Sequence, residues 1–550
     1  MRKIIILTAS CLIALNLYAQ IATNEEPIGL QTGFRGTFQE SINIAAPDIG
    51  QIRKEEKDLG LVPYAYACPV KYTLENSGVW QTLEDGSRLW RLKVSLPGAL
   101  STNTYYDRFW LPEGGKFFVY SEDTKQSIGA ITSEFIKGSR ESPIQFATAL
   151  IYGETVVYEY YQPVSIKETP VIIISRIDYG YQNINNPYAE STRASGYGTS
   201  GLCMVNINCS EGNNWQTEKH AVARISVRDN NGSYWGSGAL INNTKNDYTP
   251  YVLTAHHVIN AVGSDAIDNP DANQWIFYWE YERSGCSNST IEPTHRTTTG
   301  AVVVANAFVS DFALLKLTQN PRCVSGVTPY YLGWDRSGNS GTGGVGIHHP
   351  SGDVKKISTH NITPSNSNCY SAGSSYLSLQ NWNFWKINWM QTPNGFSVTE
   401  GGSSGSPLLN NNKRVIGQLH GAGTFGYCDN TDCSNPALDI SNYGKFSVSW
   451  TGDGNSDYRR RLNYWLDPNG ANVTTLNGVS PPPCPSIVNL IGTVSSPIIV
   501  STTTTYISCG NIIVQYVKVQ NGAKLILDAE GEVYLNNDFE VALGSELEII

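Results

Sequence analysis

The sequence predicts an all-β protein made of several domains, and three observations support this prediction. Gly and Pro are abundant, with 51 and 26 of the 550 residues, which indicates many turns. Runs of β-branched and aromatic residues alternate with polar ones, which is the period of a half-buried strand. Charged residues make up only 16%, against a usual ~25%, and this profile favours a secreted β-protein. At roughly 150 residues per domain, the length indicates three or four units.

The composition also excludes several classes of protein. A net charge of −10 argues against a nucleic-acid binder, because such a protein needs basic patches to neutralise phosphates. Hydrophobic residues make up 40%, enough for a packed core, so wholesale disorder is not expected. After the N-terminal region no stretch reaches ~18 uninterrupted apolar residues, so we expect no transmembrane helix.

The first 19 residues are interpreted as a secretory signal peptide. Arg2 and Lys3 give a positive start, residues 4–17 are apolar, and Ala19 is a small residue at the predicted cleavage site. A lipoprotein signal would use Cys11, but only a few apolar residues precede that cysteine. We therefore expect a secreted, extracellular protein whose cysteines pair in an oxidising compartment.

Residues 20–197 are expected to form a β-rich domain. Strand patterns occur at 90–96, 117–120, 156–158 and 171–174, and residues 111–115 between two of them have turn chemistry. This domain holds no catalytic cluster, and its single cysteine is Cys68. Residues 193–201 are small and polar, which predicts an exposed linker open to proteolysis.

Residues 479–550 are expected to form a Pro-rich linker followed by a small C-terminal β domain. Residues 481–483 are all Pro and make a stiff spacer. Beyond it a short pattern recurs 22 residues later, which is typical of stacked hairpins or solenoid rungs. The recurring pairs are Val519 and Val541, Gly522 and Gly544, Ala523 and Ser545, Leu525 and Leu547, and Leu527 and Ile549. The domain would serve attachment to the cell surface or secretion machinery, or would cap the protein for stability.

Three short segments within residues 198–478 indicate chemistry. His256 and His257 end a strand pattern, Asp311 precedes an apolar strand, and Ser404 lies in a Gly/Ser-rich loop. Each segment is weak alone, but together they supply a base, a carboxylate and a hydroxyl in the chain order His, Asp, Ser. Glycines around Ser404 allow a tight turn that aims the amides of Gly402 and Ser404 at one point, where an oxyanion could be held.

These segments resemble the trypsin-like serine peptidases, and residues 198–478 as a whole are similar to the bacterial lysyl endopeptidases. Further matching stretches lie at 240–244, 346–350, 417–421, 449–452 and 465–468. The resemblance implies a chymotrypsin-like double β-barrel with the active site between the barrels. It also implies a secreted serine endopeptidase that cleaves peptides and proteins through an acyl-enzyme, uses no cofactor and is made as a proenzyme.

The same resemblance assigns a role to each residue of the site. His257 is the general base, Asp311 is the carboxylate that orients it, and Ser404 is the nucleophile. The amides of Gly402 and Ser404 form the oxyanion hole.

Substrate-binding positions also follow from the resemblance. His420 matches a His that lies beside the catalytic His along the substrate groove, and Gly421 follows it. A pocket for Lys needs a buried carboxylate, because an unpaired buried ammonium is costly. The two positions at which relatives carry that Asp hold Ser441 and Val398. We therefore expect a neutral pocket for an apolar or aromatic side chain, with lysine specificity as the alternative if a loop shift brings Asp439 into the pocket.

Two disulfides, Cys203–Cys428 and Cys209–Cys286, are implied by the resemblance. Three further cysteines have no assigned partner: Cys323, Cys369 and Cys433.

Gly198 matches the mature amino terminus of the lysyl endopeptidases, so residues 20–197 would be a propeptide domain that aids folding or plugs the groove. The residue before Ser404 is Ser403 rather than Asp, so we expect that the new terminus cannot form the ion pair that switches on many zymogens. Cleavage after Tyr197 would make Tyr the recognised residue, and Arg193 offers a basic alternative.

Two rival functions belong to other classes. A metal hydrolase would use the His pairs at 256–257 and 348–349, but neighbouring residues on a strand point to opposite faces and His-Glu-x-x-His is absent. We therefore interpret His256, His348 and His349 as buried structural residues and expect no metal site. The other rival is a non-catalytic secreted adhesin or binding protein on a degenerate protease fold, which an organophosphonate would not label at Ser404.

Overall fold

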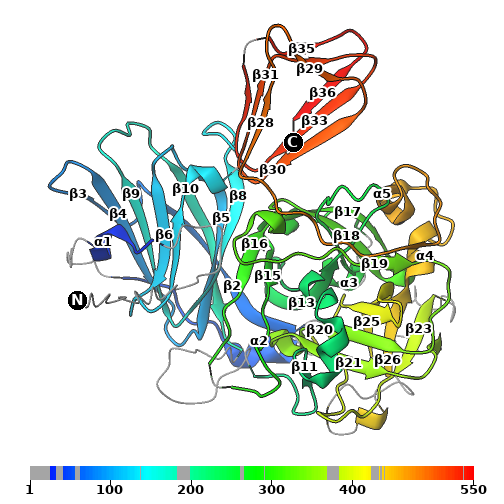
Figure 1. The fold of residues 1–550 in the computed structure, drawn as a ribbon. Coiled ribbons are helices and arrows are strands. Elements are labelled where there is room, and N and C mark those ends of the chain that lie inside the picture. The colour runs from blue at the N-terminus through cyan, green and yellow to red at the C-terminus, as the bar shows by residue number, and fades with distance from the viewer. Residues whose placement is uncertain are drawn as a thin grey trace, which may run out of the picture.

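The structure is a computed structural model in which strands dominate, so the predicted all-β class is confirmed. It describes residues 25–31, 41–55, 62–136, 138–182, 198–259, 266–289, 291–367, 383–422, 433, 436–438, 440–536 and 538–549. The α-helices in these ranges are short: α1 (Ile28–Gln31), α2 (Ile49–Glu55), α3 (His256–Ile259), α4 (Phe446–Thr451) and α5 (Asn463–Leu466). None of these helices is long and apolar enough to cross a membrane. Figure 1 shows an N-terminal part in blue and cyan, a central part in green and yellow, and a C-terminal part in orange and red.

The N-terminal part begins with a six-stranded sheet in the order β1-β4-β9-β6-β7, with β3 beside β4. Its strands are β1 (Ile42–Asn43), β3 (Val79–Thr82), β4 (Arg88–Ser95), β6 (Lys116–Ser121), β7 (Ser127–Ile131) and β9 (Thr155–Gln162). The strands predicted at 117–120 and 156–158 lie inside β6 and β9, and the strand predicted at 90–96 overlaps β4, which begins two residues earlier and ends one residue earlier. Leu92, Phe117 and Tyr158 of these strands pack into one buried core, which accounts for their apolar character.

A second sheet of eleven strands crosses from the N-terminal part into the central part. The N-terminal strands in it are β2 (Val62–Thr73), β5 (Ser101–Trp110), β8 (Ile144–Tyr152) and β10 (Val171–Gly180). The junction is the antiparallel pair of β2 and β13 (Gly232–Leu240), in which Ala65 lies opposite Ser233 and Tyr66 opposite Gly232. The two parts are therefore joined by backbone hydrogen bonds as well as by the chain itself.

Side chains along this junction are buried like those of a domain core. The ring of Tyr64 stacks on Trp235 with centroids 4.1 Å apart, and the Tyr64 hydroxyl lies 2.5 Å from Ser226 Oγ. Asp178, fully buried, pairs with Arg176 and accepts a hydrogen bond of 2.6 Å from Ser233 Oγ. Removal of either side of this junction would thus expose apolar rings and an ion pair to water.

The central part is built from two sheets that share one core, which fits the expected double barrel. The remaining strands of the eleven-stranded sheet are β12 (Val222–Arg228), β14 (Tyr251–Ala255), β15 (Ile276–Trp279), β16 (Arg296–Thr299), β17 (Ala301–Ala307) and β18 (Phe312–Leu317). The strands of the ten-stranded sheet are β11 (Val205–Asn206), β19 (Gly333–Asp335), β20 (Gly344–His348), β21 (Lys356–His360), β22 (Ser365–Asn366), β23 (Phe384–Asn388), β24 (Pro407–Asn410), β25 (Arg414–Ala422), β26 (Ile440–Lys445) and β27 (Thr475–Leu476). Leu253 and Leu314 from the eleven-stranded sheet and Ile347 and Leu409 from the ten-stranded sheet belong to the shared core.

The C-terminal part is a stack of parallel strands, so of the two predicted forms it is the solenoid and not the hairpins. Three three-stranded parallel sheets are formed by β28-β31-β34, β29-β32-β35 and β30-β33-β36. Their bounds are β28 (Ile487–Ile491), β29 (Ile498–Val500), β30 (Thr504–Ser508), β31 (Asn511–Gln515), β32 (Val517–Val519), β33 (Lys524–Ala529), β34 (Val533–Leu535), β35 (Glu540–Val541) and β36 (Glu546–Ile549). The repeat is reproduced as strand register, because Val519 pairs with Val541, and Leu525 with Leu547.

The disulfides differ from the implied pairs in one case. The structure joins Cys209 to Cys286, as the resemblance implies, but it joins Cys203 to Cys433 and not to Cys428. The reason is position: Cys433 lies close enough to Cys203 for a Cα–Cα distance of 5.3 Å, and its sulfur also accepts a hydrogen bond from the Cys203 amide. Cys428 and Cys369 lie outside the described residues.

Cys509 of the C-terminal part lies beside both Cys323 and Cys484, at Cα–Cα distances of 5.0 and 5.8 Å. Because a sulfur forms one disulfide at a time, Cys509 can be joined to one of these two cysteines. A bond to Cys323 would tie the C-terminal part covalently to the central part.

Candidate active site

Strand pairing brings His257 and Asp311 together although they are far apart in sequence. β14 and β18 are antiparallel neighbours, and Ala255 lies opposite Phe312 at the end of the pair. The residues just after β14 and just before β18 must therefore be adjacent. Asp311 has a positive φ of 54°, and its carbonyl accepts a 3.0 Å hydrogen bond from the His256 amide.

The carboxylate of Asp311 holds His257 at two points. One oxygen, Oδ2, lies 2.7 Å from His257 Nδ1, and the other, Oδ1, accepts from the His257 amide at 2.9 Å. This arrangement favours the tautomer with its proton on Nδ1, which leaves Nε2 free to accept a proton. A fixed imidazole of this kind is what a general base requires.

His420 shares the same carboxylate. Its Nδ1 lies 2.6 Å from Asp311 Oδ2, and its ring stands nearly perpendicular to that of His257, with centroids 5.7 Å apart. Asp311 is buried, with its side chain 4% exposed, while the side chains of His257 and His420 are 20% and 23% exposed. One buried carboxylate thus supports two partly accessible imidazoles.

This shared contact has opposite effects on two of the groups. Burial alone would raise the pKa of Asp311, but the charges and hydrogen bonds of His257 and His420 outweigh it and hold that pKa well below its usual range. Burial disfavours the charged form of His420, yet the Asp311 carboxylate raises the pKa of this imidazole above its usual value of 6.5.

Ser404 lies in a turn that packs against the end of β14. A Cβ added at Gly405 would lie 2.1 Å from Thr254 Oγ1 and 2.8 Å from the Ala255 amide, so only glycine fits this close approach. The Gly405 amide donates to the Leu419 carbonyl, directly before His420 in β25. The Ser404 turn is therefore held between the strand ends that carry the two histidines.

Ser404 is nearly buried, with 6% exposure, and its hydroxyl makes no hydrogen bond to another described residue. The direct contacts of the site therefore join His257, Asp311 and His420, while Ser404 lies nearby without a hydrogen bond to His257. Hydrogen bonds of this kind are often open in the absence of substrate.

The amides of Gly402 and Ser404 have no acceptor among the described residues, whereas those of Ser403, Gly405 and Ser406 donate to carbonyls. Gly402 has φ of 87°, a conformation that glycine adopts without strain. Two unpaired amides on one tight turn are the donor set that an oxyanion needs.

Ser237 is a residue of the site that the sequence did not reveal. Its amide donates to the Ser404 carbonyl at 2.8 Å, and its hydroxyl donates to the Gly402 carbonyl at 2.9 Å. Its partners lie up to 167 positions away (404 − 237), and no local pattern marks this serine. Ser237 links β13 of the eleven-stranded sheet to the turn that carries Ser404.

The other histidines singled out in the sequence have separate, buried partners. His256 Nδ1 lies 3.1 Å from Asn306 Oδ1, and His349 Nδ1 lies 2.9 Å from the Asp353 carbonyl. His348 lies between Ser403 Oγ and Ser358 Oγ, and burial lowers its pKa to about 3. These contacts support the structural interpretation of the three residues. Among the described histidines, the one whose ring nitrogen lies close to both His257 and Asp311 is His420, not His256, His348 or His349.

The positions expected to form the specificity pocket are buried and neutral. Ser441 Oγ accepts a 2.8 Å hydrogen bond from Trp389 Nε1 and lies 2.7 Å from Thr399 Oγ1. Val398 is fully buried in the same apolar cluster as Trp389, and Gly421 pairs with Asn442 across β25 and β26. Asp439 lies outside the described residues.

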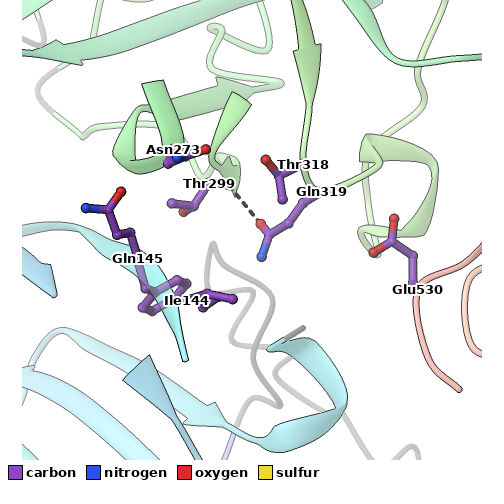
Figure 2. Close-up of a pocket in the computed structure, with 8 residues that line it drawn as sticks. Ile144, Gln145, Asn273, Thr299, Thr318, Gln319 and Glu530 are labelled. Atoms are coloured by element: carbon purple, nitrogen blue, oxygen red, sulfur yellow. Dashed lines mark hydrogen bonds between the residues drawn. The ribbon is translucent and has the colours of Figure 1, made fainter. Parts of the chain in front are cut away.

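A separate pocket lies where the three parts of the molecule meet, and none of the site residues lines it. Figure 2 shows Ile144 and Gln145 on the N-terminal side, Thr299 and Gln319 on the central side, and Glu530 on the C-terminal side. The Glu530 carboxylate accepts a hydrogen bond of 3.1 Å from the Asn320 amide. This pocket is a feature of domain contact rather than of the candidate active site.

The raised pKa of His420 gives a prediction that needs no substrate. In Asp311→Asn the carboxylate charge is lost while burial remains, so the pKa of His420 should fall by at least ~1 unit. Nuclear magnetic resonance titration of the imidazole protons measures this shift, with His420→Gln to assign the signal. Because the pKa of His420 is raised in the folded state, its ion pair with Asp311 contributes stability in full just below pH 6.5. This contribution is lost as the pH rises through the raised pKa of His420. An unchanged titration of His420 in Asp311→Asn would contradict the shared contact.

Comparison with known proteins shows which families this chain resembles. Residues 197–439 match the family model described as lysyl endopeptidase, C-terminal domain. A curated lysyl endopeptidase of Pseudomonas aeruginosa is 27% identical over 277 residues, covering 47% of this chain and 52% of the relative, so this chain spans about half of that protein. Among solved structures, the active form of the Rv3671c protease from M. tuberculosis is 17% identical with a TM-score of 0.27, covering 47% of this chain and 88% of the other. The Glu endopeptidase in complex with MPD is 18% identical with a TM-score of 0.23, covering 46% and 93%. Residues 197–439 thus match the lysyl endopeptidase C-terminal domain family, which confirms the resemblance to lysyl endopeptidases drawn from the sequence.

Proposed function

We propose that this protein is a serine endopeptidase that is exported and made as a proenzyme. The observation that carries the proposal is the Asp311 carboxylate, which fixes His257 through both its amide and its Nδ1, beside a turn with two unpaired amides. The match to the lysyl endopeptidase family supports the same activity class.

In the proposed reaction His257 Nε2 takes the proton of Ser404 Oγ as that oxygen attacks the carbonyl carbon of the scissile bond. The amides of Gly402 and Ser404 donate to the oxyanion that forms. His257 then gives the proton to the leaving amine, and water, activated by the same imidazole, releases the acid from Ser404. Asp311 remains ionised throughout and stabilises the imidazolium.

Export is supported by two features. The cysteine pairs Cys203–Cys433 and Cys209–Cys286 are disulfides, which persist in oxidising compartments. Residues 1–19 have the pattern of a secretory signal. For the parallel-strand stack at the C-terminus we propose a role in surface attachment or export.

Replacing Ser404 tests the activity. Ser404→Ala should lower kcat/KM on peptides by at least ~10³-fold, because the nucleophile is lost while the fold is kept. His257→Ala should lower kcat/KM to a similar extent. The double variant should be no less active than either single variant, because the two residues act as a unit. Hydrolysis of a peptide library and labelling by an organophosphonate measure the effect, and circular dichroism checks the fold. Full hydrolysis by Ser404→Ala would remove the assignment, and absence of labelling in the unaltered protein would favour the non-catalytic rival.

For specificity we propose a neutral pocket formed around Ser441, Val398 and the Trp389 indole. A buried ammonium would find a hydroxyl there instead of a carboxylate, at a cost that disfavours Lys. Aromatic or apolar side chains would instead be bound by burial of their surface. Cleavage after Tyr197 fits this preference.

Introducing a carboxylate into this pocket tests its position. In Ser441→Asp the new side chain can still accept from Trp389 Nε1, and its charge would pair with a substrate ammonium. The ratio of kcat/KM for Lys over Tyr substrates should therefore rise at least ~10-fold, which is about 1.4 kcal/mol of preferential binding. Ser441→Asn is the matched control and should leave the ratio unchanged. An unchanged ratio in Ser441→Asp would place the pocket elsewhere.

For residues 20–197 we propose the role of a folding aid rather than a plug. Its contacts with the central part include Tyr64 on Ser226 of β12, and Tyr105 and Asp178 on Ser233 of β13, beside the pairing of β2 with β13. Ser237, two residues beyond the stretch of β13 that pairs with β2, holds the turn of Ser404. Pairing with β2 therefore supports the strand that positions the nucleophile.

Asp178→Ala tests this role in the full chain. The variant leaves Arg176 buried without its partner, which costs roughly 3–5 kcal/mol. We expect the yield of organophosphonate-labelled protein to fall at least ~10-fold. A loss of ~1.4 kcal/mol in the free energy of unfolding already lowers the ratio of folded to unfolded protein by that factor. The kcat/KM per labelled Ser404 should stay unchanged. Asp123→Ala, on an exposed turn of the same part, is the control. An unchanged yield, or a rise in kcat/KM, would contradict a folding role and favour a plug.

A further inference from the structure

Residues 198–201, the start of the central part, are bound by two carboxylates. The Gly198 amide lies 2.7 Å from Asp353 Oδ1, and Ser200 Oγ donates to Asp353 Oδ2 at 2.6 Å. The Gly201 amide donates to Glu400 Oε1 at 3.0 Å. The segment is therefore held at its first residue, where the resemblance places the mature terminus.

Asp353 is buried, with 1% exposure, directly after the short turn η8 (Pro350–Gly352). The Val354 amide also donates to its Oδ1, at 2.7 Å. The basic group closest to it among the described residues is Lys356, whose Nζ is 3.7 Å from Oδ2 and also donates to Asn206. The two groups form a buried ion pair, but 3.7 Å is longer than a good hydrogen bond, so among the described residues no cation donates a short hydrogen bond to this carboxylate.

The turn before Asp353 is in direct contact with the loop that holds Gly401 and Gly402. The Ser351 amide donates to the Gly401 carbonyl at 2.6 Å, and Ser351 Oγ donates to Glu400 Oε2 at 3.1 Å. A Cβ added at Gly402 would lie 2.9 Å from the Gly352 amide and 3.0 Å from the Ser351 amide. With no space between them, a shift of this turn must also shift Gly402.

We infer that Asp353 receives the ammonium group that forms on Gly198 when the chain is cut after Tyr197, and that this ion pair fixes the turn beneath Gly402. The inference rests on the proposed function and deepens it, by naming a positioning residue for the oxyanion hole. The position before Ser404 is the neutral Ser403, whose hydroxyl is bound by His348, so the acidic partner lies in another loop.

The chemical step is hydrolysis of one peptide bond. Water adds to the carbonyl carbon of Tyr197, the C–N bond to Gly198 breaks, and the products at neutral pH are the Tyr197 carboxylate and the Gly198 ammonium. An amide that donates one neutral hydrogen bond to Asp353 thereby becomes a cation with three donors. Charge-assisted hydrogen bonds are roughly twice as strong as neutral ones, so the contact gains strength on cleavage.

The ion pair makes the effect dependent on pH. An α-amino group ordinarily has a pKa of about 7.7–8.0, and the buried carboxylate raises it. The pair is therefore present at neutral pH and is lost as pH rises through the raised value. The charged and titratable groups that face Asp353 or its turn are Lys356, Glu400, Glu292, Tyr281, His349 and Arg224.

The test uses the full chain with residues 193–197 replaced by the recognition sequence of an added endoprotease. One form is cut directly before Gly198, and a second form keeps one extra Ala before Gly198, which moves the ammonium away from Asp353. The first form should have a kcat/KM at least ~10-fold above the uncut and Ala-extended forms, since a well-placed oxyanion donor is worth ~10²–10³. Its kcat/KM should also fall at alkaline pH.

Asp353→Asn in the first form should lower kcat/KM to the level of the Ala-extended form and remove the alkaline decline, while Asp335→Asn is the control and should change neither. Equal kcat/KM in the first and Ala-extended forms, or an alkaline decline that persists in Asp353→Asn, would overturn the inference. The comparison with the Ala-extended form needs no substitution at Asp353 and so stands even if that variant misfolds. If no form hydrolyses peptides or is labelled at Ser404, the proposed function fails and this inference with it. If both cut forms are equally active, only the inference fails.

Discussion

The central part depends on one buried carboxylate, Asp311, at the place where two neighbouring strands end. A carboxylate taken out of water is stable only when its oxygens are satisfied. Here they are satisfied by the His257 amide and by two imidazoles. The register of β14 against β18 is what brings these donors to it, so the chemistry of the site and the pairing of the strands are one constraint.

His420 and His257 both contact the same oxygen of the Asp311 carboxylate. An imidazole with a raised pKa on the same oxygen as His257 Nδ1 provides part of the positive charge that keeps Asp311 ionised. Two histidines on different strand ends also fix the carboxylate from two sides, which limits its rotation. The side chain that orients the base is therefore itself oriented.

Local patterns allowed much of the fold to be predicted, and long-range pairing accounts for what they missed. Alternation at 90–96 and the repeat linking Val519 to Val541 became strands and strand register, because both depend on nearest neighbours. The His, Asp and Ser segments could be found because each has its own local signature. Ser237 and the Cys203–Cys433 bond could not, because their roles depend on partners more than a hundred residues away, which no local pattern encodes. The pairing of β2 with β13 likewise depends on distant partners, and it crosses the domain boundary predicted after residue 197, so the two predicted domains share one sheet.

Because the sheet is continuous, cleavage of the chain and release of the N-terminal part are separate events. Hydrolysis near residue 198 severs a single covalent bond, yet every rung between β2 and β13, the Tyr64–Trp235 stack and the Asp178–Ser233 contact are left in place. A nicked molecule would accordingly persist as two non-covalently associated fragments, with their dissociation governed by its own, independent barrier.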